Sequence, residues 1–379
     1  MSQSFLAEPS SDVLVTVIVP VFNTPPVLIE RAVVSVLNQS HPNLELLIVD
    51  DGSAAEIAGF LDRTAERDPR MRVVHRENGG VSAARNTGVD HALGDFIAYL
   101  DADDYLETEF LASALTVART TDADAVFGGI RVLHEGGSVE WRTGGPPASD
   151  PLLGTNDLIV TACIGALSDS PSPQQPTPLL SVTNVVSSLH KAANARRHRF
   201  PEGVSHAEDR LYNLSLLLET ARVAFCSDVW YVYDQTHDQG VTRHATPRTI
   251  AALARTTREF ARVGRMLGKQ RELSANAHDR ITRAAAEGVL NYLKVLTGVL
   301  AVVPFARENR LILRALLEEP SVHIAVAQAK RISWKDQVFA YAAYHGRIGL
   351  LRFLGRLWVR SGGLGMSAGA ITHGTGRKS

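Results

Sequence analysis

The chain has 379 residues, of which 45% are hydrophobic, so it exceeds the usual size of one domain and can bury an ordinary core. Its 39 basic and 40 acidic residues nearly cancel, which argues against a nucleic-acid-binding protein. With two cysteines, Cys163 and Cys226, the sequence excludes a disulfide framework and a cysteine zinc site, and it favours a reducing cytoplasm.

The N-terminal segment, residues 1–12, has neither a basic start nor a long apolar run. It is not typical of a signal peptide, and we expect it to be disordered. The localisation expected from these features is cytoplasmic, with the inner face of the membrane as a further option.

The first hundred residues alternate between strand and helix patterns. The expected strands are Val13–Val21, Leu44–Val49, Arg70–His75 and Asp95–Leu100, and the expected helices follow Pro25, follow Ser53 and cover Val81–Leu93. Such alternation predicts an α/β fold with a doubly wound, mainly parallel sheet. Ligands of such sheets bind beyond the carboxyl ends of the strands, where Asn23, Asp51 and Asp101 are expected.

Farther along, Leu111–Arg119 and Ala125–Ile130 continue the alternation, whereas residues 144–150 and 168–178 are rich in Gly, Ser and Pro and predict loops. From about Ile250 the sequence becomes rich in Ala, Leu, Arg and Glu, which predicts a smaller helical domain. We therefore expect a first domain over residues 13–245, a helical domain over 250–361 and a flexible tail over 362–379.

The apolar run Val289–Ala306 is nearly long enough to cross a membrane, but Lys294 interrupts it and it contains a proline. A buried amphipathic helix is the preferred interpretation. Membrane contact is the alternative.

An acidic cluster, Asp101, Asp103 and Asp104, follows the fourth expected strand in the string YLDADDY. Carboxylates one residue apart on a tight turn can point together at a hard divalent cation, which prefers oxygen ligands and bridges phosphate oxygens. A solvated acidic turn is the alternative, and the spacing alone does not exclude it.

Five strings occur in a characteristic order between Val13 and about His244: TVIVPVFN, SVLNQSHPNLELLIVDDGS, ENGGVSAARNTGVDHALGDFIAYLDADDY, FPEGVSHAEDRLYN and YVYDQTHDQGVTRH. In this order they resemble the motifs of the family 2 inverting glycosyltransferases of GT-A fold. The resemblance implies a nucleotide-sugar donor, usually a UDP-sugar, bound with Mn²⁺ or Mg²⁺ at a D-x-D motif. It also implies a saccharide, lipid-linked or other hydroxyl acceptor, with cell-envelope or extracellular polysaccharide ranked first.

The resemblance assigns donor contacts to several residues. Those of the nucleoside pocket are Pro20, Val21, Phe22, Asn23 and Asp51. Asp51 would accept a hydrogen bond from the base, although an aspartate that ends a strand is more often a turn residue. Arg85 would lie near the donor phosphates or sugar, and a surface helix arginine is its alternative.

In the acidic string, the resemblance places Asp101 at the ribose and the metal, Asp103 on the metal, and Asp104 at the donor sugar or around the metal. His237 would contact the metal or diphosphate, but its loop is one residue longer than the family pattern, and Asp234 stands where an arginine is usual. The phosphate contact of this loop is therefore in doubt.

The resemblance assigns the general base to Asp209 and gives its neighbour Glu208 a role in orienting the acceptor or tuning Asp209. Two close carboxylates resist simultaneous ionisation. By itself, an acidic pair at the start of a helix is typically a feature that complements the helix dipole.

Two other classes of protein share this kind of sheet. A dinucleotide-dependent oxidoreductase needs a G-x-G-x-x-G turn after a strand, and Gly79, Gly80 and Gly88 do not have that spacing. A catalytically inactive nucleotide-sugar-binding or scaffold protein remains the alternative, because a fold does not determine a function. Possible peripheral membrane contact of the C-terminal helices is a further expectation.

Overall fold

The computed structural model describes most of the chain in separate stretches. They are residues 12–133, 137, 139–142, 151–153, 159, 162–163, 182–204, 207–219, 222–236, 247–267, 274–302, 307–328 and 334–360. The expected loops at 144–150 and 168–178, His237 and the tail from 362 lie outside these residues.

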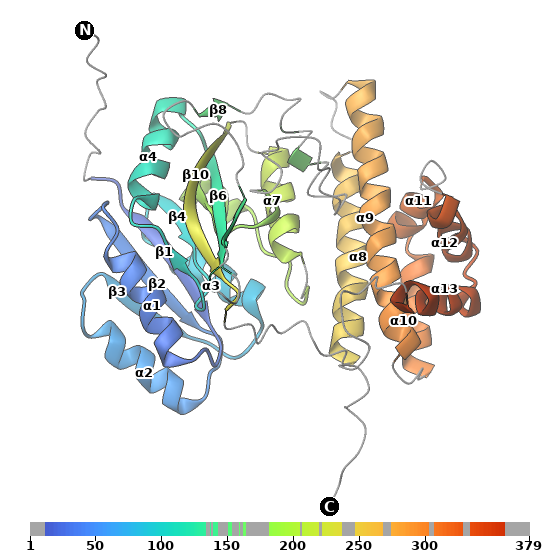
Figure 1. Ribbon diagram of the computed structural model, residues 1–379, viewed down its shortest axis with the longest axis horizontal. Coiled ribbons are helices and arrows are strands. Elements are labelled where there is room, and N and C mark those ends of the chain that lie inside the picture. The colour runs from blue at the N-terminus through green and yellow to red at the C-terminus, as the bar shows by residue number, and fades with distance from the viewer. Residues whose placement is uncertain are drawn as a thin grey trace, which may run out of the picture. The chain divides into compact units, whose positions relative to one another are not determined.

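A mixed β-sheet forms the centre of the first compact unit (Figure 1). Its strands are β1 Val15–Val21, β2 Leu44–Asp50, β3 Met71–His75, β4 Phe96–Tyr99, β5 Tyr105–Leu106, β6 Ala125–Leu133, β7 Val139–Arg142, β8 Leu152–Leu153, β9 Ser188–Lys191 and β10 Val223–Asp234. The strand order is β3-β2-β1-β4-β9-β6-β10-β5, with β7 beside β6 and β8 beside β10.

Strand direction agrees with the expectation of a mainly parallel sheet in its first part and departs from it farther on. Strands β3, β2, β1 and β4 are parallel neighbours, and β6 and β10 are also parallel to each other. Strand β9 is inserted between β4 and β6 and is antiparallel to both. The short strands β5, β7 and β8 are antiparallel as well. The sequence signalled the βαβ units, but short strands that pair over long distances leave no such pattern.

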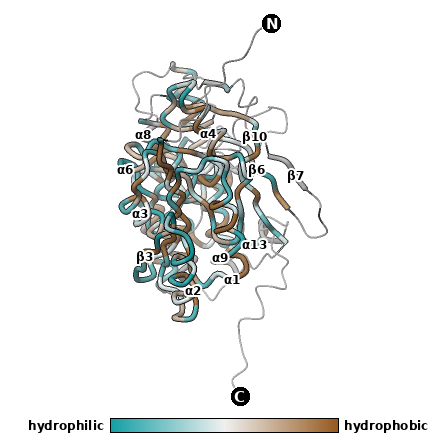
Figure 2. The backbone as a smooth tube through the Cα atoms, turned by 90° about the vertical axis from the view of Figure 1, so that its left-hand side faces the viewer, coloured by the Kyte–Doolittle hydropathy of each residue, from teal (hydrophilic) through white to brown (hydrophobic). Residues whose placement is uncertain are grey.

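Buried strands at the centre of the sheet explain the continuous apolar runs in the sequence. All seven residues of β2 are buried, as are six of the seven of β1. This pattern is typical of parallel strands that helices cover on both faces. Figure 2 follows the hydropathy along the chain, with hydrophobic segments in brown and hydrophilic segments in teal.

Helices join the strands of this unit and cover the sheet. They are α1 Pro26–Leu37, α2 Ala55–Ala65, α3 Val81–His91, α4 Phe110–Thr121, α6 Ala192–Arg197 and α7 Glu208–Glu219, of which α7 belongs to this unit from Tyr212 on. Strands β1, β2 and β3 succeed each other in one direction across the sheet, and then the chain returns past them to β4. Because parallel crossovers are right-handed, α1 and α2 cover one face and α3 covers the other. The direction of winding changes between β1 and β4, which is where ligands bind in such sheets.

The second compact unit contains the C-terminal helices and also takes in Gly203–Leu211. Its long helices are α8 Pro247–Leu267, α9 Ala275–Val302, α10 Arg307–Glu318, α11 Pro320–Gln328, α12 Trp334–Tyr344 and α13 Ile348–Arg360. Helix α9 packs against α8, α11 and α13, and it buries Val289, Leu293 and Leu296 completely. The preference for a buried helix in this apolar run is thus confirmed as far as Leu300, and none of the described helices has the length and apolarity of a membrane span.

A histidine bridge joins two strands and a helix at the edge of the first unit. The His75 ring contacts the Asp50 carboxylate through Nδ1 at 2.8 Å and the Asp62 carboxylate through Nε2 at 2.9 Å. The hydrogen bond to Asp50 raises the pKa of His75 most, and the hydrogen bond to Asp62 adds to this effect. Protonated His75 therefore ties the end of β2 to α2.

We predict that the free energy of unfolding falls as the pH rises from about 6.5, the unfolded-state pKa of histidine, through the higher folded-state pKa of His75. The loss should be at most about 1 kcal/mol, because the His75 side chain is 43% exposed. Urea denaturation between pH 6 and 9 measures it. His75→Gln should flatten this dependence, whereas the control His91→Gln, whose ring contacts a carbonyl of its own helix, should keep it. An unchanged dependence in His75→Gln contradicts the prediction.

Candidate functional site

The ends of β1 and β2 are held together by short hydrogen bonds around Asn23. The Asn23 side-chain oxygen accepts a hydrogen bond from the main-chain amide of Ala54 at 2.8 Å. The main-chain amide of Asn23 donates to Ser53 Oγ at 3.0 Å. Asn23 has a φ of 51°, a left-handed conformation that asparagine tolerates well. The neighbouring Phe22 is 54% exposed, so its ring is available to a flat ligand at this edge. Pro20 and Val21 lie in β1 itself, where Val21 is buried.

Asp51 is 2% exposed, and its carboxylate is already well coordinated. It accepts hydrogen bonds from the amides of Gly79 at 3.0 Å and Gly80 at 2.7 Å, and it forms an ion pair with Arg76. Gly80 precedes α3 with a φ of 88°, a conformation that favours glycine. Asp51 therefore joins β2 to the start of α3, and a carboxylate has about four acceptor positions for these partners and a ligand together.

Asp101 follows β4 and pairs with Arg85 of α3, whose Nη2 donates to Asp101 Oδ1 at 2.7 Å. The Arg85 side chain is only 2% exposed, while that of Asp101 is 35% exposed. The guanidinium also lies over the Phe200 ring, 5.3 Å from its centre, which is a cation–π distance. Arg85 is thus a buried residue that orients an accessible carboxylate, rather than the surface arginine of the alternative interpretation.

Asp103 is the exposed carboxylate of the acidic turn. The surrounding protein and the nearby Asp101 carboxylate together raise the pKa of Asp103. Such crowding of negative charge at a solvent-accessible position favours the binding of a cation.

Asp104 points into the protein and is 1% exposed. One carboxyl oxygen accepts a hydrogen bond from the Tyr231 hydroxyl, and the other accepts from the Asp234 amide at 2.9 Å. Burial, together with the charges of Asp101 and Asp103, raises the pKa of Asp104 to about 8. The contacts of Asp104 in the structure therefore attach the acidic turn to β10.

Arg31 of α1 forms a second link between the acidic turn and β10. Its guanidinium pairs with Asp234 and donates to the main-chain carbonyl of Asp103, and it lies 5.0 Å from the centre of the Tyr105 ring. Burial raises the pKa of Asp234, but hydrogen bonds from Thr236 and the pair with Arg31 outweigh that effect and hold the pKa below its ordinary value. Asp234 is therefore a charged anchor for Arg31.

The acidic turn suits a cation that brings ligands of its own. Among the described residues no three acidic, histidine or cysteine side chains gather into a metal site. Mg²⁺ in nucleotide-binding proteins is typically held by one or two carboxylates and by the phosphates of the substrate. Asp103 and Asp101 match that donor set, because both carboxylates are accessible.

Glu208 and Asp209 are the first two residues of α7, and both are half-buried. They belong to the segment that groups with the second unit, so their catalytic roles stay predictions. Ala207, just before them, has a φ of 61°, which is uncommon for alanine and indicates local backbone strain.

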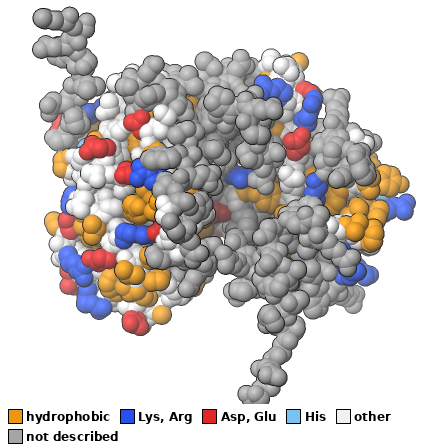
Figure 3. All heavy atoms as spheres, viewed as in Figure 1, with side chains coloured by type: hydrophobic (Ala, Val, Ile, Leu, Met, Phe, Trp, Pro, Cys, Tyr) orange, Lys and Arg blue, Asp and Glu red, His pale blue; other side chains and the backbone are white. Residues whose placement is uncertain are grey.

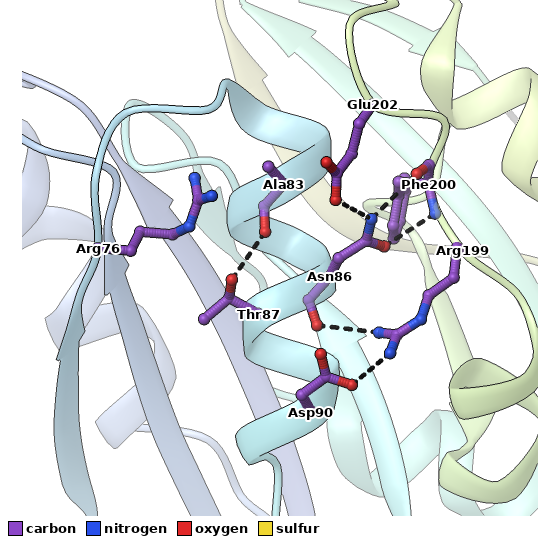
Figure 4. A pocket seen from close by; sticks show the side chains of 8 residues that line it. All are labelled: Arg76, Ala83, Asn86, Thr87, Asp90, Arg199, Phe200 and Glu202. Carbon is purple, nitrogen blue, oxygen red and sulfur yellow. Dashed lines mark hydrogen bonds and ion pairs between the residues drawn. The ribbon is translucent and has the colours of Figure 1, made fainter.

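A pocket of about 360 Å³ lies along α3, beside the Asp51 cluster (Figure 4). Arg76 lines one side of it, and the Asn86 amide binds the main chain of Phe200 at 2.9 and 3.0 Å on the other. Glu202 contacts the same amide at 3.2 Å. This α3 pocket is polar and shares Arg76 with Asp51.

Sequence reasoning missed Arg31 and Arg76. Arg76 stands three residues before Gly79 in the string HRENGG, which is the only hint that the chain offers. Arg31 lies in an ordinary amphipathic helix, and its partner Asp234 is 203 residues away. No local pattern announces such a contact.

We predict that the pair Arg31–Asp234 is coupled in stability. Asp234→Asn and Arg31→Met should each lower the free energy of unfolding by about 2 kcal/mol, because each leaves a partly buried charge without its partner. The double variant should lose less than the sum of the two. Urea denaturation measures all three. The exposed pair Arg67–Glu30 is the control, and Arg67→Met should change stability by less than about 0.5 kcal/mol; additive losses at Arg31 and Asp234 would contradict the coupling.

Comparison with known sequences gives a consistent result. Residues 16–162 match the model of the family described as glycosyl transferase family 2. The uncharacterized glycosyltransferase EpsJ of Bacillus subtilis is 30% identical over 229 residues, which cover 58% of this chain and 60% of that protein. Glycosyltransferase GlyG of Streptococcus pneumoniae is 36% identical over 116 residues, or 30% of this chain and 38% of that protein. The chain therefore matches less than two thirds of the length of these relatives.

Among solved structures, the fold is similar to that of Staphylococcus aureus TarS 1–349. The complex of that protein with UDP gives a TM-score of 0.62 at 17% identity, over 92% of this chain and 91% of the other. Its complex with UDP-GlcNAc gives 0.61 at 18% identity, over 92% of each chain. At such identities the likeness establishes the fold. Together with the order of β1 to β4, it indicates a domain of GT-A fold, in which residues 16–162 match the model of glycosyl transferase family 2.

Proposed function

We propose that this protein is an inverting glycosyltransferase that moves a sugar from a nucleotide diphosphate, most simply a UDP-sugar, to an acceptor hydroxyl. The observation that carries the proposal is the convergence of Phe22, Asp51, Asp101 and Asp103 at the carboxyl ends of β1, β2 and β4 in a family 2 domain. We place the acceptor among saccharides or lipid-linked glycans of the cell envelope or of extracellular polysaccharide, and the reaction in the cytoplasm.

The nucleoside would lie against the exposed ring of Phe22, with Asp51 as the hydrogen-bond acceptor for a base N–H. Because the Asp51 carboxylate already accepts from Gly79, Gly80 and Arg76, the base must share this acceptor or displace Arg76. The α3 pocket beside Arg76 leaves room for that side chain to move. Asp101, held by Arg85, would face the ribose.

Asp103 and Asp101 would hold Mn²⁺ or Mg²⁺ together with the diphosphate. The cation would neutralise the charge that develops on the leaving group. Two contacts with β10 hold the turn in place: Arg31 pairs with Asp234, and Asp104 accepts hydrogen bonds from Tyr231 and the Asp234 amide. His237 and the role of its loop remain part of the proposal on the strength of the sequence motif.

Asp209 would act as the general base. It would take the proton from the acceptor hydroxyl as that oxygen bonds to the anomeric carbon, while the bond between this carbon and the diphosphate oxygen breaks on the opposite side. Glu208 would orient the acceptor. Attack from the side opposite the leaving group inverts the anomeric centre.

We predict that Asp103→Asn lowers the affinity for UDP in the presence of Mn²⁺ by at least about tenfold, because it removes one charged ligand of the cation. Affinity for UDP in the presence of EDTA should change little. Isothermal titration calorimetry measures both. Glu66→Gln, which alters an exposed carboxylate at the end of α2, is the control and should behave as the unmodified protein. If Asp103→Asn keeps the full effect of Mn²⁺, the metal lies elsewhere.

We further predict that Asp209→Asn slows sugar transfer about a hundredfold or more while UDP-sugar binding stays near that of the unmodified protein. The change keeps the size of the side chain and removes its proton acceptor. Donor turnover, screened over UDP-, GDP- and dTDP-sugars with Mn²⁺, is the readout, with circular dichroism to check folding. If Glu208→Gln loses transfer and Asp209→Asn does not, the base is Glu208. If both variants turn over normally but unfold more easily, the pair serves only the start of α7.

A further inference from the structure

An exposed surface of mixed apolar and basic character lies on α10 and α13, two helices of the second unit that pack against each other. Three large apolar side chains face solvent there: Leu311 of α10 at 57% exposure, and Phe353 and Leu357 of α13 at 56% and 46%. Phe353 and Leu357 are one helical turn apart, so they share a face of α13. We call this set, with the arginines that surround it, the α10–α13 surface.

Arginines surround these apolar side chains. Arg310 and Arg356 are exposed, and Arg352 is half-buried. Burial, followed by the charges of Arg356 and Arg310, lowers the pKa of Arg352, which shows that arginines of both helices lie within electrostatic reach of one another. Helix α13, with the sequence IGLLRFLGRLWVR, has three arginines and no acidic residue. Helix α10 has three arginines and two glutamates, so arginines outnumber acidic residues six to two over the two helices. The surface therefore has a net positive charge around an apolar centre.

We propose that the α10–α13 surface binds an anionic lipid bilayer. Phe353, Leu357 and Leu311 would enter the boundary between headgroups and acyl chains, and the guanidinium groups would bind lipid phosphates. Figure 3 shows hydrophobic and basic side chains next to each other among the C-terminal helices, on the right of the view. The inference goes beyond the proposed transfer reaction and does not depend on its donor chemistry.

The composition of the surface favours a bilayer over the other occupants. A symmetric contact with a second copy would bring the same arginines of both copies together, since a two-fold interface places each patch against itself. A small soluble anion would account for the arginines but would leave the three apolar side chains in water. A charged bilayer satisfies both groups at once. The association would be peripheral, since no helix in the described part of the chain qualifies as a membrane span.

Sedimentation of the full-length protein with vesicles tests the proposal, using phosphatidylcholine alone and phosphatidylcholine with phosphatidylglycerol. We expect binding to the mixed vesicles, little binding to the neutral ones, and release at high salt. Arg310→Gln with Arg356→Gln should weaken binding roughly thirtyfold, since each arginine at an anionic surface contributes about a factor of five. Phe353→Ser with Leu357→Ser should weaken it at least about tenfold.

Matched controls come from exposed positions elsewhere. Arg262→Gln with Arg283→Gln changes two exposed arginines on α8 and α9, and Leu93→Ser changes an exposed leucine of the first unit. All three control changes should leave vesicle binding within about twofold. Circular dichroism and donor turnover of every variant separate loss of binding from loss of folding and from failure of the proposed reaction.

Three results would overturn the proposal. Equal binding to neutral and anionic vesicles, or none to either, excludes a bilayer that is recognised by charge. If the control variants lose as much vesicle binding as the α10–α13 variants, the α10–α13 surface is not the site that binds the bilayer. A concentration-dependent dimer in light scattering, abolished by Phe353→Ser with Leu357→Ser, assigns the surface to a second copy of the chain.

Discussion

The change in the direction of winding between the neighbouring strands β1 and β4 is the constraint on which the site depends. Strands β1, β2 and β4 are adjacent and parallel, so the residues that follow them meet at one edge of the sheet. The right-handed crossover sends α3 to the opposite face, and the amides of Gly79 and Gly80, just before α3, donate to Asp51. Phe22, Asp51 and Asp101 thus lie at the same edge because of the strand order, although Phe22 and Asp101 are 79 positions apart in the sequence.

Charge compensation is the second organising feature. Each of three aspartates at this edge has its own arginine: Asp51 pairs with Arg76, Asp101 with Arg85 and Asp234 with Arg31. Asp103 is more exposed than these three aspartates, and Arg31 donates to its main-chain carbonyl rather than to its carboxylate. A set of acidic residues that would otherwise repel each other is in this way held in place, and the exposed carboxylate is the one best suited to a cation.

Much of this arrangement could be predicted from the sequence, and the limits have physical causes. Apolar runs that end in polar residues located β1, β2, β3 and β4 to within one or two residues, because buried parallel strands need such runs. The ends of these runs placed Asp51 and Asp101 at one edge of the sheet, whereas the donor and metal roles of Asp51, Asp101 and Asp103 stay predictions. The antiparallel strand β9, the buried contacts of Asp104 and the arginine partners were not predictable, because they depend on pairings over long distances that no local periodicity records.

The burial of Asp104 makes the three aspartates of the acidic turn unequal. Burial and the two neighbouring carboxylates raise the pKa of Asp104 to about 8, and its two oxygens accept hydrogen bonds from the Tyr231 hydroxyl and the Asp234 amide. The letters DADD suggest three equivalent carboxylates, but of the three only Asp101 and Asp103 are accessible from solvent. A ligand at this turn would therefore meet two carboxylates, while the third attaches the turn to β10 from inside the protein.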